Sequence, residues 1–554
     1  MVPPDLVVLN GRLLTMDPAR PRASALALSG GRIAAVGETA EIRGLAGPAT
    51  RIVDAQGATV LPGFIDSHVH LFQGAVELDY LDLYGVTGIE ALTDRVRAYA
   101  AANPADRVVF AIQADYAVLG PGRSTTRQDL DRVLPDRPFA MFAPDHHTIW
   151  ANTRALELAG LLHGGATEMG SEIRLAPDGT ATGELREPGA YAPILAHTRY
   201  GGRDMFGLVS GADPAPAPTA AERALDATVM ARGLRHAASH GITSLHNMDG
   251  NFYTAEILQA CEAAGDLLCR TEVPFHLKSH DPLSRFEEAE EMRRRFASDW
   301  LWTGRVKMFM DGVVESSTAL MIEPYPGLTT TGDAVFTPEH FNAACIEADR
   351  RGFQIAVHAI GDLAVRRTLD GFQAAREANG PRDSRHRVEH IEVLDPADLP
   401  RFKELGAVAS IQPGHAPFGG VFPPDGAGKM LHARQIPWAF AWRKIRDSGA
   451  RVIFSTDWPV MPVDVTTNLK AAVAPLDLGE PWVDNAQTLA ETLESYTAGN
   501  AWVEFNEDRK GRLAPGMMAD VAVMSHDLEA LPPSEIDQAR AAVTICGGRI
   551  TWEA

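Results

Sequence analysis

The feature that most constrains this chain is a set of histidine, lysine and aspartate residues that each end a short apolar run. The set contains His68 and His70 in FIDSHVH, Lys307 in RVKMFMDG, His358 in IAVHAIGD, His390 in RVEHIEV and Asp457 in FSTDWPV, with His246 in TSLHNM left outside it. A single buried histidine is usually a core residue with satisfied hydrogen bonds. Several that each end a separate buried strand predict side chains that converge at one mouth of a parallel barrel, where metal sites and active sites belong.

The apolar runs that carry these residues predict an α/β fold. We expect strands to end within residues 63–70, 241–248, 269–277, 305–312, 353–360, 385–393, 407–415 and 451–460. Segments with helical character separate most of them, for example residues 337–352 and 362–380. Repeated alternation of strand and helix predicts a closed (β/α)8 TIM barrel over residues 61–507.

Both ends of the chain are rich in short strands and turns. Residues 1–60 and 508–554 contain apolar runs joined by Asn-Gly and Gly-Gly pairs, which are hairpin signals. We expect the two ends to pair into one small β-sandwich. The alternative is two independent hairpins, each of which would be too small to be stable alone.

The connection between the first and second barrel strands is far longer than the dozen or so residues that such a connection needs. Residues 72–225 carry strand-like runs of their own, including RVVFAIQAD and RPFAMFAPDHH. We interpret this segment as an inserted subdomain at the barrel mouth. Because loops on that face line the pocket of a barrel enzyme, the insertion is predicted to cover the substrate.

Composition narrows the classes of function. The net charge of -21 argues against nucleic-acid binding, and no run approaches the roughly 20 apolar residues of a membrane span. The four cysteines form no CxxC pair, and no secretory signal is evident, so a reducing cytoplasm is the simplest setting. Neither a phosphate-binding P-loop nor a GxSxG nucleophile elbow is present. A small-molecule substrate is the expected partner, and a homodimer is left open.

The spacing of His68 and His70 matches the period of a strand. Both imidazoles, and Asp66 before them, should therefore face the same side, as chelation of one ion requires. Asp457 is costly to bury in an apolar run unless it is paired or bound to a metal. Its alternative role is the N-cap of the next helix.

Lys307 is flanked by apolar residues and is expected to be buried. A buried lysine must lose its charge, pair with an acid or be chemically modified. An ion pair with Asp311 or Glu315 is the alternative to a functional role.

Seven motifs together resemble the amidohydrolase superfamily. They are LPGFIDSHVH, RVKMFMDGVVESSTALMIEPY, VHAIGDLAV, RHRVEH, IQPGH, FSTDWPV and GRLAPGMMADVAVM. More narrowly, they are similar to its YtcJ-like branch, amidohydrolase family 3, which includes N-substituted formamide deformylases. The resemblance covers nearly the whole chain, and the order and spacing of the motifs make it specific.

The resemblance implies a metal site. Its ligands would be His68, His70, Lys307, His358, His390 and Asp457. In this family pattern the H-x-H pair and the aspartate bind the more buried metal, while His358 and His390 bind a second one. Lys307 resembles a lysine that carbon dioxide carboxylates so that it bridges two ions. Nitrogen and carboxylate donors favour zinc, as one ion, or as two if Lys307 is carboxylated. For His246 we expect a supporting or core role.

The resemblance also implies substrate contacts. DHHTIWANT resembles the family pattern D-G-H-S-x-x-x-N, so that His147 and Asn152 match its histidine and asparagine. His146 stands where that pattern has glycine, which puts the family's loop conformation in question. Further contacts are expected from His415, Trp458 and Phe72, the last two as apolar walls with core packing as the alternative.

The implied activity is hydrolysis of a C–N amide-type bond, in an N-acyl or N-formyl amide, by metal-activated water. Asp457 would move the proton, and His147 would hold the substrate carbonyl. An ester or lactone hydrolase, and a metal-dependent decarboxylase or isomerase on the same barrel, are the alternatives. A non-catalytic scaffold is disfavoured, since every ligand position holds a competent residue type.

Overall fold

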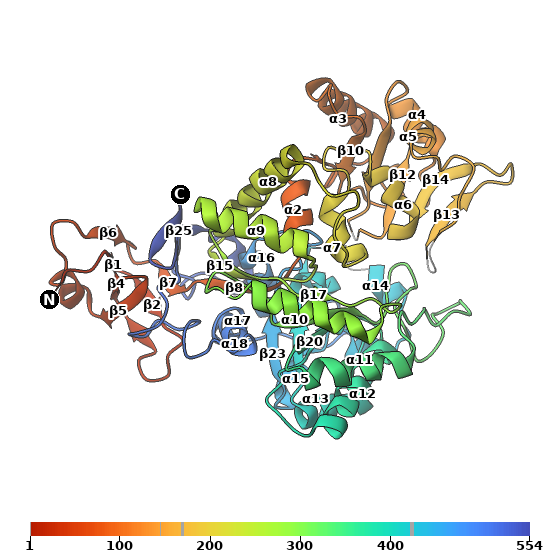
Figure 1. The fold of residues 1–554 in the computed structure, drawn as a ribbon. Coiled ribbons are helices and arrows are strands. Elements are labelled where there is room, and N and C mark those ends of the chain that lie inside the picture. Colours follow the sequence, from red (N-terminus) through yellow and green to blue (C-terminus); the bar gives the residue numbers. More distant parts are fainter. Residues whose placement is uncertain (1, 145, 168–170, 422–425) are drawn as a thin grey trace. The chain divides into compact units, whose positions relative to one another are not determined.

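The computed structural model describes residues 2–144, 146–167, 171–421 and 426–554, and Figure 1 shows its elements coloured along the chain. By its internal contacts the chain divides into two compact units. One unit is Met1–Leu71 with Leu234–Ala554, and the other is Phe72–Gly233.

Strands from both ends of the chain pair with each other in the first unit. A sheet in the order β5-β4-β1-β6 contains β1 (Leu6–Leu9), β4 (Ala25–Ser29), β5 (Arg32–Gly37) and β6 (Arg51–Asp54). A sheet in the order β26-β25-β24-β7-β2-β3 contains β2 (Arg12–Leu14), β3 (Arg22–Ala23), β7 (Thr59–Pro62), β24 (Val521–Met524), β25 (Ala541–Cys546) and β26 (Arg549–Glu553). Strand β7 is antiparallel to β24, with Val60 opposite Val523, and both share one apolar core with Leu6 and Leu28. The expected pairing of the two ends is therefore present.

Two glycine pairs make the hairpin turns of these sheets. Gly30 and Gly31, between β4 and β5, have φ of 57° and 74°, and Gly547 and Gly548, between β25 and β26, have φ of 59° and 77°. A two-residue turn of this kind needs positive φ at both positions, which glycine adopts without steric cost. The Asn10-Gly11 pair differs from the prediction, because it leads from β1 in one sheet to β2 in the other and makes no hairpin.

All eight predicted barrel strands coincide with strands of the first unit. They are β8 (Phe64–Val69), β15 (Ile242–Asn247), β16 (Arg270–Glu272) with β17 (Phe275–His276), β19 (Arg305–Phe309), β20 (Gln354–Ala359), β21 (Arg387–His390), β22 (Val408–Ile411) and β23 (Arg451–Phe454). Every pairing between them is parallel and follows their order in the chain. This α/β arrangement carries the carboxyl ends of the strands to one edge.

The strands form two parallel sheets instead of one continuous ladder. The predicted third strand is interrupted at Val273 and Pro274, where proline has no N–H for the ladder, and β16 and β17 consequently belong to different sheets. At the other junction a single parallel bridge joins Val69, at the end of β8, to Trp458, beyond β23. Among the described strands, closure into a full barrel ladder is thus not present.

Helices follow most of these strands. They are α9 (Phe252–Ala264), α10 (Phe286–Arg295), α11 (Pro338–Arg350), α12 (Asp362–Asn379), α13 (Leu399–Leu405), α14 (Gly426–Lys429), α15 (Trp442–Asp447), α16 (Val465–Val473), α17 (Leu489–Tyr496) and α18 (Ala498–Val503). The two helices predicted by example are α11 and α12, which pack on each other and on β20 (Figure 1). They can approach closely because Gly371 of α12 has no Cβ. A Cβ at this position would lie 2.4 Å from the ring of Phe341 on α11.

The second unit is built on one mixed sheet in the order β13-β14-β12-β11-β10-β9. Its strands are β9 (Leu81–Asp82), β10 (Val109–Ile112), β11 (Phe139–Phe142), β12 (Thr148–Ala151), β13 (Glu172–Leu175) and β14 (Ala181–Arg186). Its helices are α3 (Ile89–Ala102), α4 (Arg127–Val133), α5 (Thr153–Leu158), α6 (Pro188–Leu195) and α7 (Phe206–Val209), while α2 (Leu71–Glu77) and α8 (Ala220–Ala238) join the units in sequence. Consecutive residues of β10, Val109 and Phe110, enter different apolar cores, as expected for a sheet covered on both faces.

None of the helices in the described part of the chain is both long enough and apolar enough to cross a membrane.

A buried ion pair ties the barrel strands to the C-terminal strands. Arg270, at the start of β16, donates to both carboxylate oxygens of Asp520 at 2.8 and 3.1 Å, and both side chains are 5% exposed. We expect Asp520→Ala to lower the free energy of unfolding by about 3–5 kcal/mol, because it leaves a buried guanidinium unpaired. Urea denaturation measures the loss. As a control, Glu529→Ala removes the exposed partner of Arg22 and should cost less than about 1 kcal/mol. Equal stability of the two variants would contradict this role of Asp520.

Candidate metal centre

The predicted ligands all lie in the first unit, at or just beyond the carboxyl ends of its parallel strands. His68, Lys307, His358 and His390 belong to β8, β19, β20 and β21, while His70 and Asp457 follow β8 and β23. All six residues are buried, with at most 7% of their surface exposed. Strand order alone therefore brings together residues that are far apart in the sequence.

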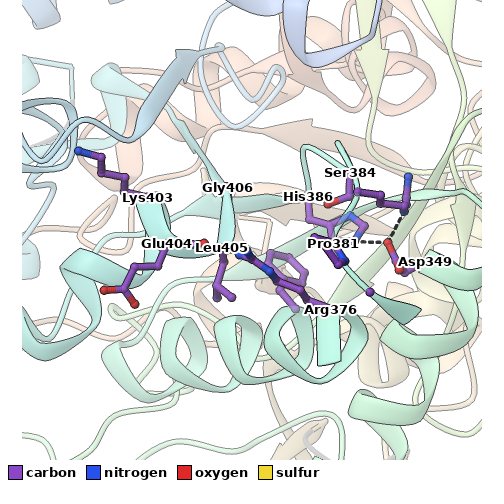
Figure 2. Close-up of a pocket in the computed structure, with 12 residues that line it drawn as sticks. Asp349, Arg376, Pro381, Ser384, His386, Lys403, Glu404, Leu405 and Gly406 are labelled. Atoms are coloured by element: carbon purple, nitrogen blue, oxygen red, sulfur yellow. Dashed lines mark hydrogen bonds and ion pairs between the residues drawn. The ribbon is translucent and has the colours of Figure 1, made fainter. Parts of the chain in front are cut away.

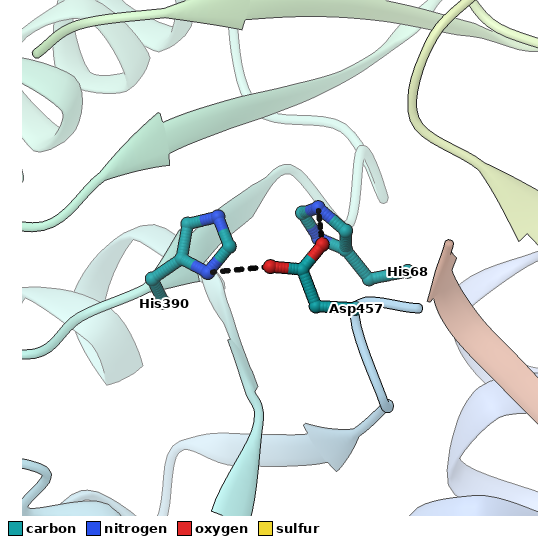
Figure 3. A group of neighbouring side chains, drawn as sticks. All are labelled: His68, His390 and Asp457. Carbon is teal, nitrogen blue, oxygen red and sulfur yellow. Dashed lines mark ion pairs between the residues drawn. The ribbon is translucent and has the colours of Figure 1, made fainter. Parts of the chain in front are cut away.

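Asp457 lies at the centre of the group. Its Oδ1 is 3.4 Å from Nε2 of both His68 and His70, and its Oδ2 is 3.5 Å from Nε2 of His415 and 4.0 Å from Nδ1 of His390. Figure 3 shows the carboxylate between the rings of His68 and His390. Donor atoms of His68, His390 and Asp457 lie within 4.8 Å of one another, as a shared ion requires.

Hydrogen bonds to Asp66 fix the backbone next to Asp457. Asp66 accepts hydrogen bonds from the N–H and hydroxyl of Thr456 at 3.0 and 2.6 Å, so it fixes the residue before Asp457. Asp457 has a φ of 63° and His390 a φ of 74°, in the left-handed region that non-glycine residues rarely adopt and that concentrates at functional sites. The alternative role of Asp457 is also settled, because Asp464 caps the next helix, α16.

Three of the imidazoles are oriented by polar partners at Nδ1. The partners are Glu389 for His68 at 2.8 Å, Asp249 for His70 at 3.0 Å and Gln412 for His390 at 2.8 Å. A carboxylate or amide oxygen at Nδ1 accepts its proton and leaves the lone pair on Nε2 for a metal. The sequence prediction missed these partners, although each is a polar residue within or just after an apolar run.

Unpartnered buried atoms test whether a cation fits. His68 Nε2, Asp457 Oδ1 and Lys307 Nζ are buried and have no hydrogen-bond partner. Buried polar atoms are nearly always satisfied, so three such atoms in one place need an explanation. Neutral imidazole nitrogens beside a carboxylate are the donor set that divalent zinc prefers. These residues fit the implied ion.

Lys307 is fully buried, and neither of the ion pairs considered for it is present. Its Nζ lies 4.6 Å from the centre of the Phe309 ring, while the Asp311 carboxylate accepts backbone N–H groups from Leu320, Ile360 and Gly361. Burial lowers the pKa of Lys307 to about 8, against the opposing attraction of Glu389 and Asp457. The neutral amine that carboxylation requires is thus accessible.

The second predicted metal position is less complete. The ring of His358 lies 4.6 Å from that of His390 and stacks on Phe309, and its Nε2 is 3.1 Å from the carbonyl oxygen of Gly312. The group of His68, His390 and Asp457 does not include His358. Binding of a second ion stays a prediction.

His246 contacts polar side chains outside the set of predicted ligands. Its Nε2 is 3.0 Å from Glu504, and its Nδ1 is 3.1 Å from Arg387 and 3.4 Å from Arg305. Both ring nitrogens are therefore engaged away from Asp457.

His147, Asn152 and Phe72 lie in the second unit. His147 Nδ1 is 2.9 Å from Glu187, and His146 has a φ of 62°, in the left-handed region that favours glycine. The Nε2 of His146 bonds Glu77 at 2.8 Å, a contact that the sequence did not suggest.

The side-chain amide of Asn152 is engaged by the backbone: it caps α5 at the N–H of Ala155, accepts from Phe139 and donates to Leu134 and Arg137. In the first unit, Trp458 is 5% exposed and lies 5.6 Å from the His236 ring. The substrate contacts of these residues stay predictions.

A cavity of about 380 Å³ lies elsewhere in the first unit (Figure 2). It is lined by the end of α12, the loop before β21 and the end of α13, and His386 bonds Asp349 there at 3.2 Å. Burial opposes ionisation of Asp349, but hydrogen bonds from His386, Asn379 and Arg382 outweigh it and hold its pKa well below the usual range. Because these residues precede their strands, the cavity is not at the carboxyl ends, where barrel chemistry occurs.

Comparisons with known proteins agree with this geometry. Residues 51–552 match the model of the amidohydrolase family. The chain is 26% identical to the putative amidohydrolase YtcJ of Bacillus subtilis (strain 168), over 98% of each protein. It is 26% identical to the N-substituted formamide deformylase of Arthrobacter pascens, over 99% of this chain and 98% of that one. A structure described as an uncharacterized metal-dependent hydrolase from Pyrococcus horikoshii OT3 has the same fold, with a TM-score of 0.72, 24% identity, and coverage of 95% of this chain and 99% of that chain.

The unpartnered amine of Lys307 should destabilise the metal-free protein. We expect Lys307→Met to raise the free energy of unfolding of the metal-free protein by about 1–3 kcal/mol, since a buried polar group without a partner costs that much. Lys510 is a matched control, because it is 3% exposed but its Nζ lies 2.7 Å from both Glu504 and the Ser244 hydroxyl. Lys510→Met should lower the free energy of unfolding by about 3–5 kcal/mol. If urea denaturation shows equal losses for both variants, Lys307 has a partner in solution.

Proposed function

Because this chain belongs to the amidohydrolase family, we propose that it is a metal-dependent hydrolase that cleaves a C–N amide bond in a small molecule. N-acyl and N-formyl amides are the proposed substrate class, and the similarity to an N-substituted formamide deformylase supports it. The observation that carries the proposal is the buried carboxylate of Asp457, whose Oδ1 lies 3.4 Å from Nε2 of both His68 and His70.

His68, His70, Asp457 and His390 are the residues that would hold the ion, and zinc is the proposed metal. When bound, such an ion supplies a Lewis acid that polarises the substrate carbonyl and lowers the pKa of water to about 7. Glu389 and Asp249 keep the two histidines of the H-x-H pair in the required tautomer.

Asp457 is proposed to move the proton. Its Oδ1 has no hydrogen-bond partner and can accept a proton from the attacking water. The same oxygen then gives that proton to the departing nitrogen, so the amine leaves neutral. His415 is proposed to contact the substrate, and the 3.5 Å distance between its Nε2 and Oδ2 of Asp457 supports this proposal.

Lys307 is proposed to be carboxylated. Its neutral amine would add to carbon dioxide, forming an N–C bond and releasing one proton, so that a neutral side chain becomes an anion that could serve as a metal ligand. Its burial and its position without a paired acid support this step. With zinc present in both samples, added bicarbonate should then stabilise the wild-type protein further and have no additional effect on Lys307→Met in a thermal unfolding measurement.

Substitution of Asp457 tests the proton-transfer role. We expect Asp457→Asn to lower kcat by about 100- to 10,000-fold on an N-formyl or N-acyl amine, since the amide cannot take up the proton. Metal content, measured by elemental analysis on the same sample, separates this loss from loss of the ion. A variant that retains metal and most of its turnover would rule the role out.

Isotope transfer from water tests the reaction class. Hydrolysis of an amide, ester or lactone places one oxygen of water in the acid product, whereas decarboxylation releases carbon dioxide and takes up no water oxygen. In heavy-oxygen water we therefore expect a labelled acid by mass spectrometry. An unlabelled product with release of carbon dioxide would identify a lyase.

A further inference from the structure

A continuous row of buried charged and polar side chains runs through the first unit and ends at a predicted metal ligand. Its members, in order of contact, are Lys510, Glu504, His246, Arg387, Glu389 and His68. Each is no more than 8% exposed as a residue. The proposed function uses only its last two members, Glu389 and His68, so the remainder needs its own explanation.

Glu389 stands between a cation and the ligand. Its Oε2 is 2.8 Å from Nδ1 of His68 and accepts a hydrogen bond from NH2 of Arg387 at 2.9 Å, while its Oε1 is 2.7 Å from Nε of Arg387. Arg387 and Glu389 are two residues apart on β21, so their side chains share one face of the strand. Arg387 therefore holds the carboxylate that contacts His68 by one hydrogen bond, and its charge lies within ion-pair distance of the second oxygen.

Arg387 is itself held by three other strands. It donates to the carbonyl oxygen of Ser67 on β8 at 2.7 Å, to the hydroxyl of Ser410 on β22 at 2.9 Å and to Nδ1 of His246 on β15 at 3.1 Å. Because Arg387 is fully buried, these contacts hold its guanidinium group in one orientation. The orientation of Glu389 is thus determined by the strands rather than by its own flexible side chain.

The second half of the row fixes His246. Glu504 is 3.0 Å from its Nε2, and Lys510 pairs with Glu504 at 2.7 Å. With its Nε2 proton directed at Glu504, His246 presents the lone pair of Nδ1 to Arg387. The segment that leads to the C-terminal strands is therefore connected by direct contacts to His68.

A second buried pair nearby shows that burial alone does not explain the first. Arg305 and Glu272 are each 2% exposed and 2.7 Å apart, but Glu272 contacts none of the predicted ligands. Buried ion pairs often contribute little net stability compared with apolar residues. Of these two pairs, Arg387–Glu389 is the one that contacts a predicted ligand.

We infer that Arg387 and Glu389 are positioning residues of the metal centre, which hold His68 with its Nε2 aimed at Asp457 and increase its strength as a ligand. The inference rests on the proposed metal centre. Glu389 accepts the Nδ1 proton of His68, which fixes the tautomer, and its negative charge makes the imidazole a stronger donor. Arg387 holds Glu389 as an oriented carboxylate.

The test measures how fast the protein loses its metal to a chelator. We expect Glu389→Gln to release zinc about 10- to 100-fold faster than the wild type, the usual cost of removing such a partner. In the cobalt-loaded protein, the visible absorption bands should shift as well, because the ligand field at His68 changes. Glu389→Asp, which keeps a carboxylate, should recover part of the affinity.

Glu272→Gln is the matched control, since it removes a carboxylate of equal burial that pairs with an arginine but touches no ligand. It should release zinc at the wild-type rate even if it lowers stability. Because Glu389→Gln leaves Arg387 unpaired and could impair folding, the double variant Arg387→Met with Glu389→Gln is tested too, and it should lose zinc as fast as the single variant.

The outcomes separate the inference from the proposed function. If Glu389→Gln or the folded double variant retains zinc like the wild type, or if Glu272→Gln loses zinc equally fast, the inference is overturned while the metal centre stands. If the wild-type protein binds no zinc or cobalt, the proposed function fails, and this inference fails with it.

Discussion

Two backbone hydrogen bonds determine the candidate site. The N–H of Asp457 donates to the carbonyl of His68 at 2.8 Å, and the N–H of His70 donates to the carbonyl of Trp458 at 2.7 Å. They join the segment after β23 to the end of β8, although these are separated by nearly the whole unit in sequence. Because of this junction, the Asp457 carboxylate faces the H-x-H pair. The unusual backbone of Asp457 is therefore a property of the junction as well as of the site.

The sequence was sufficient to predict the candidate metal ligands. It was not sufficient to predict the residues that contact and orient them. Periodicity places His68 and His70 on one face, and the strand that ends at His390 can be recognised from its apolar composition. By contrast, Glu389 and Asp249 are ordinary acids in sequence, and their partners are hundreds of residues away or on another strand. Contacts of that kind depend on strand order and register, which no local pattern contains.

Similar limits apply to the fold. All eight strands were predicted, because short apolar runs bounded by turn residues are a strong signal. The interruption at Pro274 has a local cause and could have been anticipated from the missing N–H. Asn10-Gly11 was misinterpreted, since the same dipeptide can turn a hairpin or lead a chain from one sheet to the next. Which of the two occurs depends on the strands that pair with β1 and β2. One partner of β2 is β7, which in turn pairs with β24.

That pairing of β7 with β24 has a consequence for biosynthesis. As the chain emerges from the ribosome, β2 and β7 appear early, but β24 and β25 are translated only after every barrel strand. Until then, the apolar core of the early strands lacks Val521, Val523 and Ile545, and Arg270 has no Asp520 to bind. The second unit, whose sheet is contiguous in sequence, can fold while translation continues. The first unit must wait, and molecular chaperones have their longest opportunity to act on its earliest strands.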